Sequence, residues 1–260
     1  MLLIAGFATG ILIGLTGVGA GSLMTPLLML VFGVAPATVI STDLCFAALT
    51  KIGAMRLHHH AGLIEWQVLK RLWWGSIPAT LLALLSLGMG QHRFQENTLK
   101  AAVAAALLLT TVGIVFQSRL HRFMSDRIGG DIERFLRTQA FLTVLLGAAL
   151  GLMVTYTSIG AGAVGAVVLA CLYPFRLTPA RLIATDIAHA IPLTALAGAG
   201  HVLVGHVDFV LLGWLLCGSL PGVLIGAGLS SRLPQYILRV ALATVLAIIA
   251  LRLLYSLGQG

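Results

Sequence analysis

The sequence predicts an all-α polytopic membrane protein that consists of two inverted structural repeats. Of its 260 residues, 59% are hydrophobic and only 9% are charged, which is far more apolar than a water-soluble domain of this length. Several apolar runs approach or exceed the roughly 18 residues that indicate a membrane-spanning helix. These runs lack the period-two alternation of a membrane β-barrel. A glycine-rich pattern in the first half also returns in the second half.

The apolar segments can be placed in order along the chain. Residues 2–15 and 23–34 flank a glycine-rich break, and further membrane segments are expected at residues 38–55, 71–87 and 98–116. Polar connections are expected at residues 56–70 and 118–138, the second being a cytoplasmic linker between the halves. The prediction is a single membrane domain, 1–260, with repeat one at 1–117 and repeat two at 139–260. Each repeat would contain a glycine-broken helical hairpin followed by three transmembrane helices.

The duplication is visible as a constant spacing between matching residues. The glycine clusters at residues 19–21 and 160–162 are 141 residues apart, and after a two-residue insertion near residue 173 the spacing becomes 143. That spacing then holds across some 40 residues, pairing Thr42-Asp43 with Thr185-Asp186, His58 with His201, Glu65 with Asp208, and Gly75-Ser76 with Gly218-Ser219. Internal repeats with interrupted helices in corresponding positions are typical of transporters.

The basic residues indicate how the halves are oriented. If both glycine-broken elements are hairpins, then of 16 Lys and Arg all but Arg93, Lys100 and Arg252 fall on one side. If each broken element crosses once, the distribution is much less one-sided. The positive-inside rule therefore favours the hairpins, inverted halves and two outward-facing termini. Half-helices of 12–15 residues reach only about 18–22 Å, so the hairpins either span or meet near the midplane as re-entrant elements.

Both glycine clusters are candidate anion-binding sites. A helix that starts after such a cluster presents backbone N–H groups with no partner in the helix, and its dipole favours a negative ligand. Hydroxyl groups beside the clusters would add donors. The alternative is that these glycines only allow close helix packing. The predicted substrate-binding residues here are Thr16, Gly19, Ala20, Gly21, Ser22, Thr157, Ser158, Gly160, Ala161 and Gly162.

Two aspartates inside apolar segments are the candidate proton-coupling groups. Asp43 and Asp186 are repeat equivalents, and an ionised side chain at a helix centre costs roughly 2.5–3.5 kcal/mol to insert. Such residues usually mark a transport pathway, a proton relay or a buried pair. His189, three residues after Asp186, could share a proton with it. Alternatively, each aspartate caps a neighbouring half-helix or pairs with Lys51, two turns after Asp43.

The sequence contains no enzyme signature. A nucleophile elbow, a zinc-protease helix motif and a phosphate-binding loop are all missing. The three cysteines are isolated, and the histidine run at residues 58–60 has no metal-site spacing, so neither a metal site nor a cofactor is predicted. The net charge of +8 is attributed to basic residues in cytoplasmic loops, which indicate the topology, and not to nucleic-acid binding.

The motifs resemble those of a known family. The glycine break GVGAGSLMTPLL followed by APATVISTD, and the second copy SIGAGAVGAVVL followed by TPARLIATD, are similar to the TauE/SafE family of sulfite-exporter or sulfonate-uptake permeases. The resemblance covers nearly the whole chain. It implies transport of sulfur-containing oxyanions across the bacterial inner membrane, with Thr42 and Thr185 at the substrate. Typical members place Ser after that Thr, whereas this chain has Asp in both halves.

The expected function is therefore a secondary transporter for sulfite, thiosulfate or an organosulfonate. It would work by alternating access near the midplane, coupled to protons through the aspartates, in a multi-pass protein of the bacterial inner membrane. Its partners would be the small anion and the lipid bilayer, and no nucleic acid. The sequence leaves undecided whether the protein forms a homodimer. The alternatives are an anion channel, a cation or metal carrier that uses the Asp and His side chains, and a non-transporting scaffold.

Overall fold

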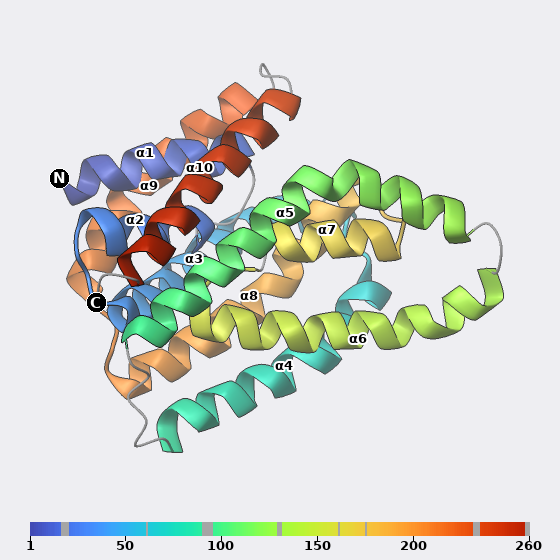
Figure 1. Ribbon diagram of the computed structural model, residues 1–260, viewed down its shortest axis with the longest axis horizontal. Coiled ribbons are helices and arrows are strands. Elements are labelled where there is room, and N and C mark those ends of the chain that lie inside the picture. Colours follow the sequence, from blue (N-terminus) through green and yellow to red (C-terminus); the bar gives the residue numbers. More distant parts are fainter. Residues whose placement is uncertain are drawn as a thin grey trace.

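The computed structural model describes residues 1–16, 21–60, 62–89, 96–128, 132–160, 162–174, 176–230 and 235–257, and within these ranges the chain forms ten α-helices and no strand (Figure 1). The all-helical prediction is confirmed. The helices are α1 (Leu2–Thr16), α2 (Gly21–Val31), α3 (Pro36–His60), α4 (Trp66–Met89), α5 (Glu96–Ile128), α6 (Ile132–Thr157), α7 (Ala163–Leu172), α8 (Pro179–Val204), α9 (Phe209–Ser230) and α10 (Gln235–Leu257).

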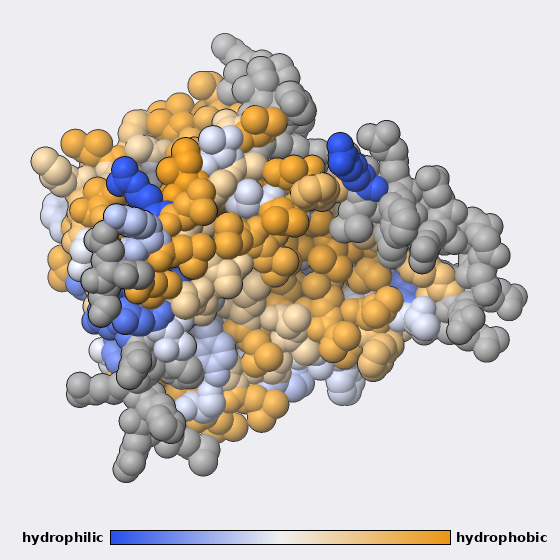
Figure 2. Space-filling model, in the orientation of Figure 1, coloured by the Kyte–Doolittle hydropathy of each residue, from blue (hydrophilic) through white to orange (hydrophobic). Residues whose placement is uncertain are grey.

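The described helices include five that are long and apolar enough to cross a bilayer. These segments lie in α5, α6, α8, α9 and α10, while α1 and α2 contain shorter apolar stretches. Many large apolar side chains on these helices face outward, so the surface is hydrophobic over wide areas (Figure 2). Such a surface suits lipid rather than water. The fold is therefore that of a polytopic membrane protein.

Two helices end at the glycine clusters, as the sequence predicts. Helix α1 ends at Thr16 and α2 begins at Gly21, and α6 ends at Thr157 and α7 begins at Ala163. At 11 and 10 residues, α2 and α7 are only about 16 and 15 Å long. In Figure 1 the start of α1 and the end of α10 lie at the left-hand side, and the end of α5 and the start of α6 lie at the opposite end.

Glycine allows two helix pairs to approach very closely. On α9, a Cβ at Gly218 would collide with the backbone of α1 at Leu3, and one at Gly226 would collide at Ile11, so α1 and α9 run parallel. Helices α4 and α6 pack in the same way, because a Cβ at Gly147 would collide with the backbone of Leu72. Small residues at such contacts let membrane helices pack by van der Waals contact. Each pair joins a helix that ends at a glycine cluster, α1 or α6, to a helix that is distant in the sequence.

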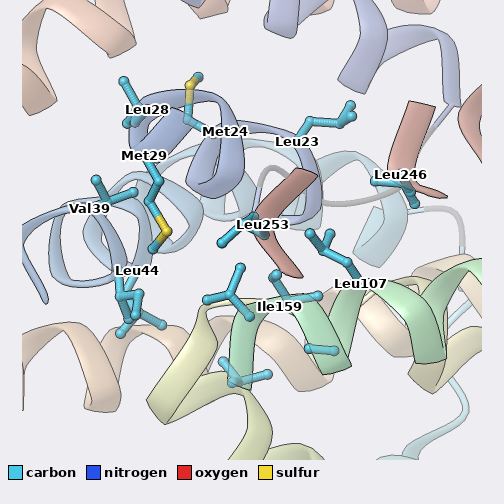
Figure 3. Close-up of a cluster of buried hydrophobic side chains, with 14 of the residues drawn as sticks. Leu23, Met24, Leu28, Met29, Val39, Leu44, Leu107, Ile159, Leu246 and Leu253 are labelled. Atoms are coloured by element: carbon cyan, nitrogen blue, oxygen red, sulfur yellow. The ribbon is translucent and has the colours of Figure 1, made fainter. Parts of the chain in front are cut away.

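The main hydrophobic core lies around α2, α3, α5 and α10. Figure 3 shows Leu23 and Met24 of α2 in one cluster with Leu107 of α5 and Leu253 of α10. Ile159, from the break between α6 and α7, belongs to the same cluster and is 1% exposed. The segment between α6 and α7 is therefore anchored in the core that contains α2.

The predicted polar connections are shorter than the sequence indicated. Helix α3 continues to His60 and α4 begins at Trp66, so much of the region 56–70 is helical. Likewise α5 continues to Ile128 and α6 begins at Ile132, and the expected linker at 118–138 is mostly helix. The prediction treated these polar stretches as connections between membrane segments. Arg, Leu, Met and Glu are good helix formers, so a helix can leave the apolar region without ending.

Candidate functional site

The two glycine breaks meet in the interior of the protein. A Cβ at Gly21, the first residue of α2, would collide with the carbonyl oxygen of Ser158, which lies between α6 and α7. Only glycine can bring a backbone this close to another. The sequence placed these two residues 137 positions apart in separate halves (158 − 21). The structure joins them at one point.

The backbone at the second break has an uncommon conformation. Ser158 has a φ of 58°, in the left-handed region that non-glycine residues rarely adopt. Gly160 and Gly162 have φ values of 119° and 138°. The Thr157 hydroxyl accepts a hydrogen bond from the N–H of Ile159 at 3.1 Å and stabilises the turn locally. A strained residue held by such contacts is characteristic of functional sites.

Asp43 of α3 lies at the first turn of α2. Its Oδ2 accepts a hydrogen bond from the Thr25 hydroxyl at 2.7 Å and lies 3.1 Å from where a Cβ of Gly21 would be. The Ser158 hydroxyl faces the same carboxyl group. Asp43 Oδ1 and Ser158 Oγ are buried and have no hydrogen-bond partner within the described ranges. The meeting point of the breaks therefore contains a buried carboxyl group and a buried serine hydroxyl that face each other.

Asp186 of α8 has the matching position in the second half. Its Oδ1 lies 2.7 Å from where a Cβ of Gly165 would be, at the first turn of α7, and finds no hydrogen-bond partner among the described residues. The structure thus places each aspartate at the start of a short helix, where the helix dipole favours a negative charge. Lys51 lies within electrostatic range of both Asp43 and Asp186. A capping role and a pairing with Lys51 both stay predictions.

The ring nitrogens of His189 form no hydrogen bond with Asp186 in the described part of the chain. Its Nε2 lies 3.0 Å from the Ser76 hydroxyl of α4, and its Nδ1 has no hydrogen-bond partner in the described part of the chain. His189 is fully buried. The three-residue spacing therefore did not identify its partner, which comes from a helix of the other half.

Thr42 and Thr185 use their hydroxyls in matching structural bonds. Thr42 Oγ1 accepts from the backbone N–H of Asp208, and Thr185 Oγ1 accepts from that of Glu65, both at 3.1 Å. Both threonines are fully buried. Each therefore ties a helix of one half to the connection before a helix of the other half. Their role in substrate binding stays a prediction.

The remaining predicted residues are only partly visible. Gly19, Ala20 and Ala161 lie outside the described residues, as does the side chain of Thr16. Ser22 is buried in the first turn of α2. The described site therefore consists of the starts of α2 and α7, the Ser158 turn and the two aspartates.

The structure also shows an ion-pair clamp that the sequence analysis did not identify. The Glu65 carboxylate, before α4, pairs with Arg176 at 3.0 Å and with Arg181, and Arg176 also donates to Gln67 at 2.8 Å. Its repeat equivalent, Asp208, instead accepts from the first N–H groups of α9 and forms no ion pair among the described residues. One repeat position is thus a clamp in one half and a helix cap in the other. The alignment of Glu65 with Asp208 was the sequence feature that could have drawn attention to this position.

A second buried polar contact holds α3, α6 and α8 together. His201 lies 2.7 Å from the Ser41 hydroxyl through Nδ1 and 3.1 Å from the carbonyl oxygen of Thr155 through Nε2. The sequence analysis paired His201 with His58 by spacing and did not find these partners. Within the described ranges, no three His, Cys, Asp or Glu side chains are placed to share a metal ion.

Comparison with known proteins identifies the family. A family model described as "Sulfite exporter TauE/SafE" matches residues 2–253, almost the whole chain. The chain belongs to the TauE/SafE family. The resemblance carried by the glycine breaks is thereby confirmed.

Relatives of this TauE/SafE protein have matching descriptions. The probable membrane transporter protein YjnA of Bacillus subtilis is 35% identical over 220 residues, which cover 84% of this chain and 85% of the relative. YdhB of the same organism, also a probable membrane transporter protein, is 26% identical over 223 residues, covering 84% and 85%. A probable membrane transporter protein of Haemophilus influenzae is 25% identical over 221 residues, covering 82% and 74%. No solved structure matches the chain.

The family and the helices together establish the coarse function. This TauE/SafE protein is a multi-pass membrane transporter and not an enzyme.

Proposed function

We propose that the protein is a secondary transporter of a small sulfur-containing anion, of the sulfite, thiosulfate or organosulfonate class, in the bacterial inner membrane. The observation that carries this proposal is the meeting of Gly21 with the Ser158 turn. There the start of α2 lies against the break that precedes α7. Helix starts offer N–H donors and a favourable dipole to an anion. Broken helices in corresponding positions of two inverted halves are where transporters bind substrates.

In this proposal, Asp43 couples anion binding to a proton. Its carboxylate lies where an anion would approach the start of α2. Two unit charges about 4 Å apart repel by about 4 kcal/mol at an effective dielectric constant of about 20. Protonation of Asp43 removes this repulsion and turns the carboxyl group into a hydrogen-bond donor. Asp186 would have the same role at the start of α7.

The proposed transport cycle is alternating access. The Glu65 clamp ties the start of α4 to the α7–α8 connection and would close that end of the protein. Its equivalent at Asp208 makes no such ion pair in the described chain, so the two ends differ. Breaking the clamp would be the step that opens the Glu65 end. Basic residues make this end the cytoplasmic one in the proposed topology.

A thermal-stability titration of the purified full-length protein tests the anion site. A ligand that binds only the folded state stabilises it by about 2.7 kcal/mol at a concentration of 100 Kd. Sulfite, thiosulfate and a sulfonate, titrated at two pH values, are expected to stabilise the protein more at the lower pH. In Asp43→Asn, which mimics the protonated side chain, the effect should persist at the higher pH. Asp208→Asn, outside the site, is the matched control and should behave like the wild type.

Other outcomes would contradict the proposal. Stabilisation by a divalent cation and by none of the anions would favour a cation carrier based on Asp43, Asp186 and His189. An anion response with the same pH dependence in Asp43→Asn and Asp186→Asn as in the wild type would remove the coupling role. Single-channel currents in planar bilayers would replace alternating access with an anion channel.

A further inference from the structure

A hydrophobic groove of about 540 Å³ lies between α5 and α7. Its walls are apolar side chains from residues 109–116 of α5 and 164–168 of α7, and Arg119 lies at one end. Figure 1 shows α7 between the two much longer helices α5 and α6. Figure 2 shows a strongly hydrophobic surface over this part of the molecule. The groove is within the size range of ligand sites.

The hollow exists partly because α5 has a glycine where it faces α7. A Cβ at Gly113 would lie 3.6 Å from Val167, an ordinary van der Waals contact, so a side chain added here would occupy the space between α5 and α7. Val112 and Phe116, on either side, are about half exposed. Residues 109 to 119 of a helix extend about 15 Å. The groove thus runs along about 15 Å of α5 and has apolar walls, which suits a hydrocarbon chain.

The corresponding region of the first half is filled by protein. By the 141-residue spacing, Val164 and Gly165 of α7 correspond to Leu23 and Met24 of α2. Leu23 and Met24 are buried in the cluster that includes Leu253 of α10 (Figure 3). At the groove itself the second half has Val164, which is smaller than Leu23, whereas Gly165 faces Asp186 and Leu150. The larger Leu23 therefore lies in a filled core in the first half, where the second half has the smaller Val164 at the groove wall.

The charge at the end of the groove indicates the occupant. Arg119 is exposed, and its guanidinium carbon lies 6.0 Å from the centre of the Phe116 ring at the groove wall. Arg119 lies three residues beyond Phe116, where the apolar segment of α5 ends. Basic residues at a helix that leaves the membrane attract anionic lipid headgroups.

We propose that this groove binds one acyl chain of an anionic phospholipid, whose phosphate group pairs with Arg119. The lipid would fill the space beside α7 and hold this short hairpin arm against α5. Since α7 starts at the Ser158 break, the lipid would support the geometry of that break. The proposed site lies on the lipid-facing surface of the protein and is independent of which substrate is transported.

Native mass spectrometry of the delipidated full-length protein in detergent can test this proposal. Phosphatidylglycerol and phosphatidylethanolamine of equal chain length are titrated, with glycerol phosphate as a headgroup without chains. The wild type is expected to bind phosphatidylglycerol more tightly and to show no binding of glycerol phosphate. Gly113→Leu, which fills the groove, should weaken phosphatidylglycerol binding at least about tenfold, and Arg119→Gln about fivefold. Val112→Phe fills the groove from an exposed position and replaces Gly113→Leu if that variant does not fold.

Two control variants change the surface elsewhere. Gly213→Leu adds an apolar side chain on α9, where a Cβ would meet nothing within 4 Å, and Arg252→Gln removes an exposed cation of α10. Both should bind lipid like the wild type. Unchanged binding in both groove-filling variants, or equal affinity for the two lipids, would overturn the proposal. A dimer that Gly113→Leu dissociates would also overturn it and assign the groove to a second copy of the chain.

Discussion

The Glu65 clamp allows a prediction whose size follows from the structure. Glu65→Gln removes the ion pairs to Arg176 and Arg181 while the backbone bond from residue 65 to Thr185 remains. The Glu65 side chain is 14% exposed and the two arginine side chains are 43% and 44% exposed, so solvent screens both pairs. Exposed pairs contribute about 0.2–1 kcal/mol each. Loss of both should shift the opening equilibrium of this end by about 2- to 30-fold.

Hydrogen exchange measures this opening directly. The reporters are the N–H of residue 65, bonded to Thr185, and the N–H of Leu177, bonded to the carbonyl of Tyr173. Both should exchange about 2- to 30-fold faster in Glu65→Gln, because their protection falls with the local opening free energy. High salt should accelerate them in the wild type and have little effect in the variant. Asp208→Asn is the matched control, and the reasoning fails if it has the same effect or if Glu65→Gln has none.

Three further predictions concern stability and binding. Gly218→Ala should lower the stability of the protein by about 1–3 kcal/mol, because its Cβ collides with the backbone of α1. The control Gly213→Ala places its Cβ in open space and should not change the stability. Equal melting temperatures of the two variants would contradict the packing of α1 against α9. Thr42→Val leaves the N–H of Asp208 without its acceptor and should cost about 1–3 kcal/mol in thermal unfolding, so an unchanged melting temperature would mean that the bond is dispensable. Ser158→Gly removes the backbone strain of a φ of 58° and should stabilise the protein by about 1 kcal/mol. The same variant should weaken anion binding. A loss of stability would show that the serine side chain contributes more to stability than its backbone strain costs.

The fold was largely predictable because its signals are local. Apolar length identified the helices, and glycine clusters placed the breaks within a few residues of where α1 and α6 end. Helix ends outside the apolar segments were not predictable from polarity, since polar helix formers continue a helix as well as apolar ones. Side-chain partners were harder still. His189 bonds to Ser76, and Thr42 bonds to residue 208. Such partners come from the other half of the sequence, so they depend on how the two halves are placed in space. The spacing of residues along the chain does not give this placement.

The parallel pairing of α1 with α9 has a consequence for biosynthesis. The surface that receives Gly6 and Gly10 is formed by Leu215 and Ser219, which the ribosome adds about 200 residues later. At 5–20 residues per second, the first hairpin waits about 10–40 seconds for its partner. During that interval its glycine-lined face can contact only lipid or the insertion machinery. A nascent chain arrested before α9 should therefore expose this face, and the first helix made is among the last to dock.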